Sequence, residues 1–311
     1  MPDNVSYTAE EIAKILRISR FTVYELIKRG ELTAYKVGRK MRIDAADLAN
    51  YKMKIKGDQP YVPGQLTPLS GQSADLQCGL VICGQDAILD ILTRHLDKNV
   101  RNVRFFRQYA GSIEGLIALY NRSVNLAAVH LWDGDSGEFN VPYVKHYLPG
   151  MRVAVVNLVY RMEGFYVAPG NPKKIKEWND LARKDVRMVN RERGSGARVL
   201  LDENLRKRDI DSRDILGYDD EEMSHLAVAS CVARGEADVG IGAEKAAMQV
   251  QSVEFVPMQN ERYDMVFLRQ DLEKPHFQAV LSILQSKSFQ NEVNGMGGYD
   301  ISKMGEIIAE I

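Results

Sequence analysis

The feature that most constrains this chain is a pair of closely spaced helix signals near its start. Thr8 and Glu11 have the spacing of a capping box, in which each side chain bonds the backbone N–H of the other residue, so a helix is expected directly after Thr8. Ser19 would cap a second helix whose apolar residues recur with helical period, and Gly30 would end it. Only residues 17–19 separate the two helices, which predicts a tight helix-turn-helix.

A basic hairpin and a third helix signal follow. Residues 33–37 and 40–43 have the pattern of two strands that turn at Gly38, and Asp44 would cap a last short helix. Residues 1–56 hold twelve Lys/Arg and seven Asp/Glu, whereas the whole chain has a formal net charge of −1. A small basic module on an acidic body is the asymmetry expected when one part of a chain contacts nucleic acid phosphates.

The candidate DNA contacts lie on the outer face of the second helix and along the hairpin, from which they would reach base edges and phosphates. An ordinary solvated helical hairpin with a charged surface is the alternative. The agreement between caps, turn length, hairpin and charge favours DNA binding. The candidates are Arg20, Thr22, Tyr24, Lys28, Lys36, Arg39, Lys40 and Arg42.

This segment resembles the excisionase-type branch of the winged helix proteins related to the MerR family. The opening Y-T-x-x-E-x-A-x-x-L of that branch is matched by residues 7–16, and its recognition helix S-x-x-T-V-Y-x-L-I-x-x-G-x-L by residues 19–32. Its wing ending G-R-x-x-R-I is matched by residues 38–43. The resemblance covers about the first 52 residues and implies a winged helix-turn-helix domain that binds double-stranded DNA.

Composition and the positions of proline and glycine divide the chain further. Prolines and glycines recur within residues 57–76, which predicts a linker between a DNA-binding domain over 1–56 and a larger body over 77–311. The chain shows no apolar signal segment at its start and no stretch of membrane-spanning length, so a cytoplasmic protein is expected. Cys78, Cys83 and Cys231 are too few for a disulfide framework, and we interpret them as small buried residues.

Beyond the linker, strand and helix patterns alternate. Short apolar runs such as residues 79–84 and 126–132 are followed by amphipathic stretches, which predicts α/β layers with largely parallel strands. Residues 151–170 have the pattern of a pair of strands, and helices near 274–286 and 288–294 are expected to close the chain. More than 230 residues of this alternation predict two lobes.

Several strand-to-helix junctions carry Gly or Ser. They fall at residues 84–86, at 111–112 and at 194–197. The free backbone N–H groups of a helix start bind anions, and glycine lets a ligand approach the backbone closely. Any one junction is more simply a cap or a tight turn, but ligands bind on this side of open α/β sheets, and three junctions together predict a ligand site.

The order of motifs in the body is similar to that of the substrate-binding-protein-like domain related to periplasmic molybdate-binding proteins. An N-R-x-x-G-S-G-x-R-x-L-L-D block is met by residues 190–202, a G-S-x-x-G-L block by 111–116, and G-x-A-D-x-G-x-G by 235–242. The resemblance implies a fold of the type II periplasmic-binding-protein class, whose two lobes close over a small ligand. It places lobe 1 at about 77–162 and 264–311, and lobe 2 at about 163–263.

The candidate ligand residues come from these junctions and motifs. Ser112 and residues 195–198 would offer N–H groups, hydroxyls and one guanidinium from opposite lobes, at an exposed cleft. Asp86 and Glu163 would lie nearby and repel a bare oxyanion unless they cap helices or bind a counterion. The full set is Gly84, Gln85, Asp86, Gly111, Ser112, His130, Asn140, Arg161, Arg191, Ser195, Gly196, Ala197, Arg198 and Tyr263.

These features predict a cytoplasmic, ligand-responsive transcriptional regulator that needs no cofactor. Its partners would be double-stranded operator DNA, a small anionic effector with molybdate or tungstate as first choice, and a second copy in a homodimer. An enzyme such as a transferase on the same fold is the main alternative, since fold does not fix function. No histidine stands beside a candidate nucleophile in the sequence, which disfavours an enzyme. A solute receptor of an importer is the third possibility.

Overall fold

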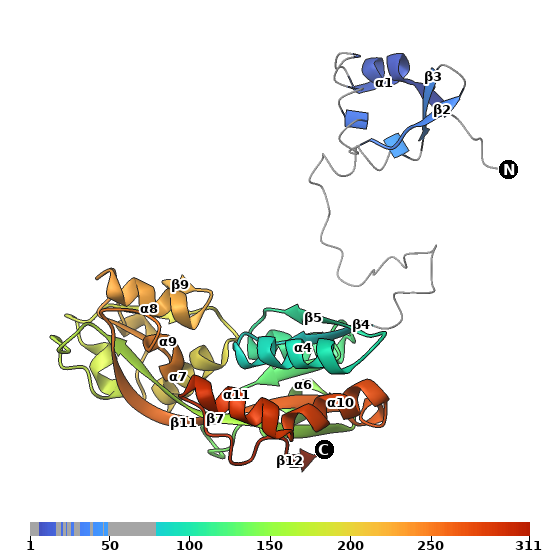
Figure 1. Ribbon diagram of the computed structural model, residues 1–311. Helices are drawn as coiled ribbons and strands as arrows, with labels where there is room; N and C mark the ends of the chain where they lie inside the picture. The colour runs from blue at the N-terminus through green and yellow to red at the C-terminus, as the bar shows by residue number, and fades with distance from the viewer. Residues whose placement is uncertain are drawn as a thin grey trace. The chain divides into compact units, whose positions relative to one another are not determined.

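The computed structural model describes residues 6–16, 20, 23, 26–27, 32–37, 40–45, 47–48 and 79–311 of the chain. The chain divides into two compact units, Met1–Gln72 and Ser73–Ile311, and each is described by itself (Figure 1).

The first unit contains the predicted capping box. The backbone N–H of Thr8 donates to Glu11 Oε2 at 2.7 Å, the N–H of Glu11 donates to Thr8 Oγ1 at 3.3 Å, and helix α1 spans Ala9–Leu16. Strands β2 (Tyr35–Val37) and β3 (Lys40–Asp44) form the predicted hairpin. A third strand, β1 (Ser6–Thr8), pairs antiparallel with β3 and was not predicted, because three residues before a helix carry no visible alternation.

The buried residues of the first unit agree with the predicted helical stripes. Ile12 of α1, together with Val23 and Leu26 of the second predicted helix, packs with Leu32 and Ile43 in one small core. The described residues of that second helix, 20, 23, 26 and 27, are helical.

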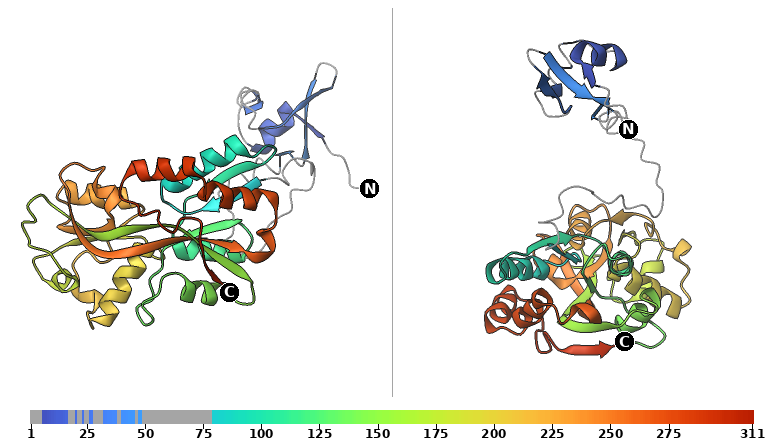
Figure 2. Two further views of the ribbon diagram at one scale, coloured as in Figure 1. Left: turned by 60° about the horizontal axis from the view of Figure 1, so that its bottom comes forward. Right: turned by 90° about the vertical axis from the view of Figure 1, so that its right-hand side faces the viewer.

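The second unit is built on one mixed sheet whose order is β5-β4-β6-β11-β7-β10-β8-β9, with β12 paired to β7. The first lobe holds three parallel strands and the second lobe three more, and two 15-residue strands cross between them (Figure 2). The strands are β4 (Gly79–Cys83), β5 (Arg104–Gln108), β6 (Leu126–Val129), β7 (Val153–Val167), β8 (Met188–Arg191), β9 (Glu221–Glu222), β10 (Val239–Ala243), β11 (Glu254–Leu268) and β12 (Ile307–Glu310).

Helices cover both faces of the sheet in each lobe. In the first lobe, α4, α10 and α11 share one core with one face of the strands, while α5 and α6 pack on the other. In the second lobe, α7 packs on one face, and α8 and α9 pack on the other. The helices are α4 (Ile88–Asn99), α5 (Ser112–Tyr120), α6 (Val141–Tyr147), α7 (Gly196–Lys207), α8 (His225–Ala233), α9 (Glu244–Ala247), α10 (Pro275–Leu284) and α11 (Lys287–Met296), with 3₁₀ turns η2 (Trp178–Ala182), η3 (Ser212–Asp214) and η4 (Arg269–Asp271).

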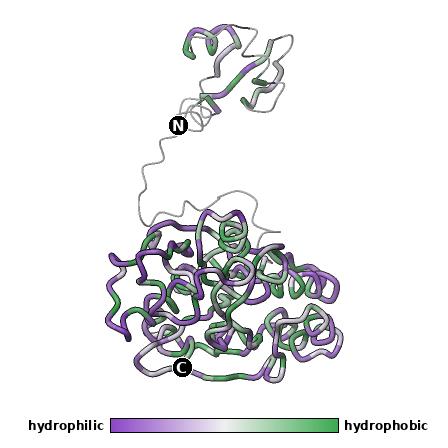
Figure 3. Tube along the Cα trace, turned by 90° about the vertical axis from the view of Figure 1, so that its left-hand side faces the viewer, coloured by the Kyte–Doolittle hydropathy of each residue, from purple (hydrophilic) through white to green (hydrophobic). Residues whose placement is uncertain are grey.

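Hydropathy follows this layering. In the second unit hydrophobic segments lie mostly in the interior and hydrophilic segments mostly toward the outside (Figure 3). Strand β6 and strand β10 are buried along their whole length. Among the described residues, no helix combines the length and the apolar character needed to span a membrane.

Two expectations about the strands were wrong. The segment expected to hold a pair of strands is one continuous strand, β7, which pairs antiparallel with β11 over nearly its full length. The central pairs β6–β11, β11–β7 and β7–β10 are antiparallel, so the sheet is parallel only on its two outer sides. An apolar run read without its partner does not reveal the direction of pairing.

Helix α6, strand β12 and the two-residue strand β9 were not predicted in this unit. Helix α6 begins after Asn140, which has a φ of 65°, and its short, aromatic-rich sequence carries no helical stripe. The chain was expected to close on a helix, whereas β12 follows and pairs with β7.

Candidate ligand site between the two lobes

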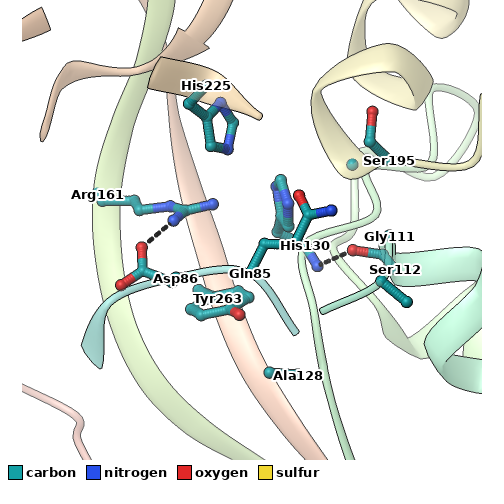
Figure 4. A pocket seen from close by; sticks show the side chains of 12 residues that line it. Gln85, Asp86, Gly111, Ser112, Ala128, His130, Arg161, Ser195, His225 and Tyr263 are labelled. Carbon is teal, nitrogen blue, oxygen red and sulfur yellow. Dashed lines mark hydrogen bonds and ion pairs between the residues drawn. The ribbon is translucent and has the colours of Figure 1, made fainter. Parts of the chain in front are cut away.

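A small cavity lies where the two lobes and the crossing strands meet (Figure 4). It encloses about 10 Å³, hardly more than the space of one water molecule, so any larger ligand requires the lobes or side chains to move. Arg161 and Tyr263 line it from the crossing strands. The other lining residues are Gln85, Asp86, Ala110, Gly111, Ser112, Ala128 and His130 of the first lobe and Ser195, Gly196 and His225 of the second.

Arg161, on β7, is the central cation of the site. Its side chain is 3% exposed; Nε donates to Glu261 and Nη1 donates to Asp86. The ring of Tyr263 lies under the guanidinium, 4.6 Å from its centre to the guanidinium carbon. Burial would lower the pKa of Arg161, but Glu261 and Asp86 outweigh burial and raise it well above the ordinary value.

One guanidinium nitrogen of Arg161 remains available. Nη2 makes no hydrogen bond to any residue in the part of the chain that the structure describes. Figure 4 shows the guanidinium reaching across the cavity toward His130. Arg161 therefore presents a charged N–H donor to the cavity while its other nitrogens are fixed by carboxylates.

Two buried carboxyl groups beside Arg161 differ in charge. Glu261 is opposite Arg161 in the β11–β7 register, and Glu163 lies two residues further along β7, so all three share one face of the sheet. Burial favours neutral Glu261, but Arg161 and His130 outweigh it and hold its pKa at about 2. Burial and the neighbouring Glu261 raise the pKa of Glu163 well above its usual range, which favours the neutral form of this carboxyl.

Two histidines face each other across the cavity, with ring centroids 6.2 Å apart. His130 Nδ1 lies 2.9 Å from Glu261 Oε2, which places its proton on Nδ1 in the neutral ring and leaves Nε2 as an acceptor. His225 Nδ1 instead accepts from the backbone N–H of Ala243 at 3.3 Å, so its proton is on Nε2. Burial, then Arg191 and Arg161, lower the pKa of His225 well below its ordinary value and keep the ring neutral.

The starts of two helices meet at the cavity. Gly111 precedes α5 and Ser195 caps α7, and the N–H of Ile113 donates to the carbonyl of Gly194 at 3.0 Å across the two lobes. A Cβ on Gly111 would lie 3.1 Å from Gly194 O, so any larger residue would need this backbone contact to shift by a few tenths of an ångström. The first residues of both helices, Ser112 and Gly196, thus line one small space.

The two serines at these starts are both buried, but their hydroxyls differ. Ser112 Oγ accepts from the N–H of His130 at 3.2 Å, which leaves its hydrogen free to donate. Ser195 Oγ donates to the carbonyl of Glu192 at 2.9 Å and accepts from the N–H of Arg198. Ser112 was expected at an exposed cleft, and the contact between the lobes is the reason that it is only 3% exposed.

Arg198, also expected at the exposed cleft, is 1% exposed and does not line the cavity. Its Nη1 donates to the carbonyl of Arg191 at 3.1 Å, and the guanidinium lies over the ring of Tyr218 at 4.1 Å. An ion pair with Glu221 completes its surroundings. The sequence places Arg198 correctly in the first turn of α7, but the side chain points into its own lobe.

Four further candidates also lie outside the cavity lining. Asn140 fixes the turn before α6, where its Oδ1 accepts from the N–H of Leu131 at 2.6 Å. Arg191 bonds Gln85 Oε1 at 2.5 Å and bridges the lobes. Gly84 has a φ of 142° and lies against Leu89 and Tyr263, and Ala197 packs in the core of the second lobe.

Sequence reasoning missed His225, Glu261, Ala110 and Ala128. His225 follows Ser224, whose hydroxyl accepts from the N–H of Ala227, so a helix start was visible there but carried no glycine. Glu261 stands in a run of consecutive polar residues, 259–262, that gives no sign of burial. Only the register with β7 brings it beside Arg161.

The candidate DNA contacts are described in part. Arg20 is exposed and pairs with Glu10 at 2.6 Å, and Arg42 Nη1 donates to the carbonyl of Ser6 at 3.4 Å. Lys36 and Lys40 occupy facing strands of the hairpin. The remaining candidates, Thr22, Tyr24, Lys28 and Arg39, lie outside the described residues.

Comparison with known proteins defines the class. Residues 93–285 match the PBP superfamily domain, and residues 6–55 match a helix-turn-helix domain. The chain therefore belongs to the PBP superfamily, and it joins a domain of ligand-binding type to a domain of DNA-binding type. This combination fits a DNA-binding regulator that also binds a ligand.

One relative has the same arrangement along its full length. The uncharacterized protein YvgK of Bacillus subtilis is 42% identical over 312 residues, which is 100% of both chains.

Two solved structures share the fold. An OxyR variant from Corynebacterium glutamicum has a TM-score of 0.53 at 15% identity and covers 93% of this chain and 89% of its own. A putative phosphate transporter substrate-binding protein from Clostridium perfringens, with bound phosphate, also has a TM-score of 0.53, at 14% identity over 71% of this chain and 98% of its own.

Proposed function

We propose that this protein is a cytoplasmic transcriptional regulator that binds operator DNA through its first domain and a small anion between the lobes of its second. The anion occupies the cavity lined by Arg161, Ser112 and the starts of α5 and α7. Molybdate and tungstate are the first candidates, and phosphate and sulfate are chemically related ones. The phosphate held by the structural neighbour supports testing this class.

The observation that carries this proposal is the imbalance between donors and acceptors at the cavity. Within the described part of the chain, Arg161 Nη2, His225 Nε2 and the hydroxyl hydrogen of Ser112 donate to no other residue, and the first residues of α5 and α7 line the cavity with them. Among the acceptors of the described lining, His130 Nε2 has no hydrogen bond, while the carboxylate of Asp86 already accepts from Arg161 and Tyr299. A cavity with several free donors is suited to an anion, because anionic oxygens accept several hydrogen bonds.

Ligand binding would be coupled to DNA through lobe closure. The cavity is too small for a four-oxygen anion, so the ligand enters an open arrangement and favours the closed one, to which it makes more contacts. We propose a homodimer, because one winged helix buries little DNA surface and two-fold operators match two-fold proteins. A change in lobe angle would then alter the placement of the two DNA-binding domains.

Calorimetric titration of the full chain, stripped of endogenous ligand, with molybdate, tungstate, sulfate and phosphate tests the effector proposal. Heat from at least one of the four is expected. Folded protein that gives no heat with any of them would remove the anion proposal and leave the DNA-binding proposal standing.

DNA binding is tested separately by replacing Arg39 and Arg42 with Ala. Affinity for all duplex sequences should fall, and the slope of log affinity against log salt should decrease by roughly one counterion for each lost phosphate contact. Arg20→Ala is the matched comparison, because a residue on the recognition helix should relax sequence preference instead. Unchanged binding and salt dependence in the double variant would reject the hairpin as a DNA contact.

A further inference from the structure

The charges around the cavity pose a problem for a doubly charged anion. Arg161 lines the cavity and Arg191 bonds the lining residue Gln85, whereas Asp86, Glu192 and Glu261 are carboxylates bonded to these two arginines. Arg161 stays charged, but its charge is already matched by two of these carboxylates. A dianion would therefore enter a site with no surplus of positive charge, which is costly in a buried setting.

His130 is the group that can change this balance. Its ring is 10% exposed and lines the cavity, and Nδ1 is held by the carboxylate of Glu261. Nε2 makes no hydrogen bond to the described residues and is the ring nitrogen that can take up a proton. Protonation of Nε2 would turn this acceptor into a donor.

Close packing restricts rotation of the His130 ring. A Cβ on Gly196 would lie 2.4 Å from His130 Nδ1, so the backbone of α7 packs closely against the imidazole. Tyr263 packs edge-on against the same ring, with centroids 5.6 Å apart. The orientation of His130 is thus fixed by both lobes and by β11.

Several charged and titratable groups surround His130. Glu261 of β11 is bonded to Nδ1 and to Arg161 of β7, while Arg191 of β8 acts on the facing ring of His225. Burial and Glu261 favour the neutral carboxyl of Glu163 on β7, and burial with two arginines favours the neutral ring of His225 on α8. Asp86, after β4, is neutralised by Arg161. A dianion beside Nε2 would attract a proton to this nitrogen.

We propose that the cleft takes up a dianionic ligand together with one proton, and that His130 Nε2 is the atom that receives the proton. The proton comes from solvent, and the resulting imidazolium lies between Glu261 and the ligand. This inference rests on the proposed anion site. It makes His130 the residue by which the cleft accepts a doubly charged oxyanion.

The test is calorimetric titration of the full chain with molybdate and with sulfate in buffers of different ionisation enthalpy. Neither anion titrates between about pH 7 and 8.5, near the range in which a histidine does. The slope of observed enthalpy against buffer ionisation enthalpy should correspond to uptake of about one proton, and the Kd should rise by up to about tenfold per pH unit. A slope near zero for the wild-type protein would overturn the proposal.

Variants assign the proton. His130→Gln keeps a side chain that can hydrogen bond and should reduce the uptake to near zero, with a Kd independent of pH. His146→Gln is the matched control, since His146 is an exposed histidine on α6, and it should retain uptake of about one proton.

His225→Gln keeps the assignment testable if His130→Gln does not bind. It should still take up about one proton, because the proton-receiving atom is unchanged. Loss of the uptake in this variant, or its persistence in His130→Gln, would contradict the assignment. Absence of heat from both anions and from phosphate and tungstate would instead refute the anion site itself.

Discussion

The two turns that meet at the cavity have similar sequences and different uses. The turn before α5 is Gly111–Ser112, and the turn before α7 is Ser195–Gly196. Ser112 accepts one backbone hydrogen bond and retains a free hydrogen, whereas Ser195 uses its hydroxyl both as donor and as acceptor to cap α7. The same residue type thus faces the ligand in one lobe and stabilises a helix start in the other.

The arginines of the site differ in the same way. Arg161 has two nitrogens fixed by carboxylates and a third directed to the cavity. Arg198 bonds a carbonyl, pairs with acidic side chains and stacks on Tyr218, all within its own lobe. The comparison teaches that a strand-to-helix junction predicts available backbone N–H groups, while distant partners decide whether its side chains remain available.

The largest effect should come from Arg161→Gln, compared with Arg198→Gln. Arg161→Gln leaves Asp86 and Glu261 buried without their cation, so we expect a loss of about 3–5 kcal/mol of unfolding free energy and no measurable anion binding. Arg198→Gln should lower the unfolding free energy by about 1–3 kcal/mol through lost hydrogen bonds and stacking. Urea unfolding and calorimetry measure the two quantities. Loss of anion binding by folded Arg198→Gln would contradict the structural role assigned to Arg198.

Glu261 and Glu163, the two carboxyl groups on the crossing strands, should affect the unfolding free energy in opposite directions. Glu261 has its pKa held at about 2, so its contribution to stability is present above its unfolded pKa and lost as pH falls toward 2. Glu261→Gln should therefore destabilise by about 3 kcal/mol at neutral pH. Glu163 has a raised pKa and thus loses stability as pH rises, so Glu163→Gln should stabilise by about 1 kcal/mol at about pH 8.

Unfolding curves of both variants and wild type from about pH 2 to 9 would measure these contributions. Because both changes replace a carboxyl by an amide on one sheet face, they are matched in size. Two destabilising effects of equal size would show that Glu163 is ionised in the folded protein.

The smallest effects should separate the two serines. Ser112→Ala removes a donor to a charged ligand and should weaken anion binding by about 1.5–3 kcal/mol, with little change in stability. Ser195→Ala removes the cap of α7 and should cost about 1 kcal/mol of unfolding free energy, with anion affinity nearly unchanged. Calorimetry and thermal unfolding of both variants decide. Interchanged results would mean that the second lobe supplies the hydroxyl.

Local signals in the sequence predicted the elements well and the side-chain surroundings poorly. Thr8 and Glu11 form the predicted capping box, and Ser195 starts a helix as expected, because caps depend on residues only a few positions apart. Gly111, Ser112 and Ser195, which the sequence marked as helix starts, line one cavity in the structure.

Long-range pairing explains what the sequence did not reveal. Glu261 and Arg161 are 100 residues apart and meet only through the β11–β7 register. His225 enters the cavity from α8, which no glycine-bearing junction marked. Asn140 and Arg198 carry the residue types of a ligand site, but their partners, Leu131 and Tyr218, hold them in structural roles.

The two crossing strands, β7 and β11, place four polar side chains on one face, and this arrangement restricts changes in the length of the strands. Arg161 and Glu163 on β7, and Glu261 and Tyr263 on β11, are separated by two residues, the repeat of an extended strand. A single inserted or deleted residue before Arg161 would exchange the faces and turn the guanidinium away from Asp86. Relatives that keep this site are therefore expected to vary β7 and β11 by substitution, with length changes confined to the loops at either end.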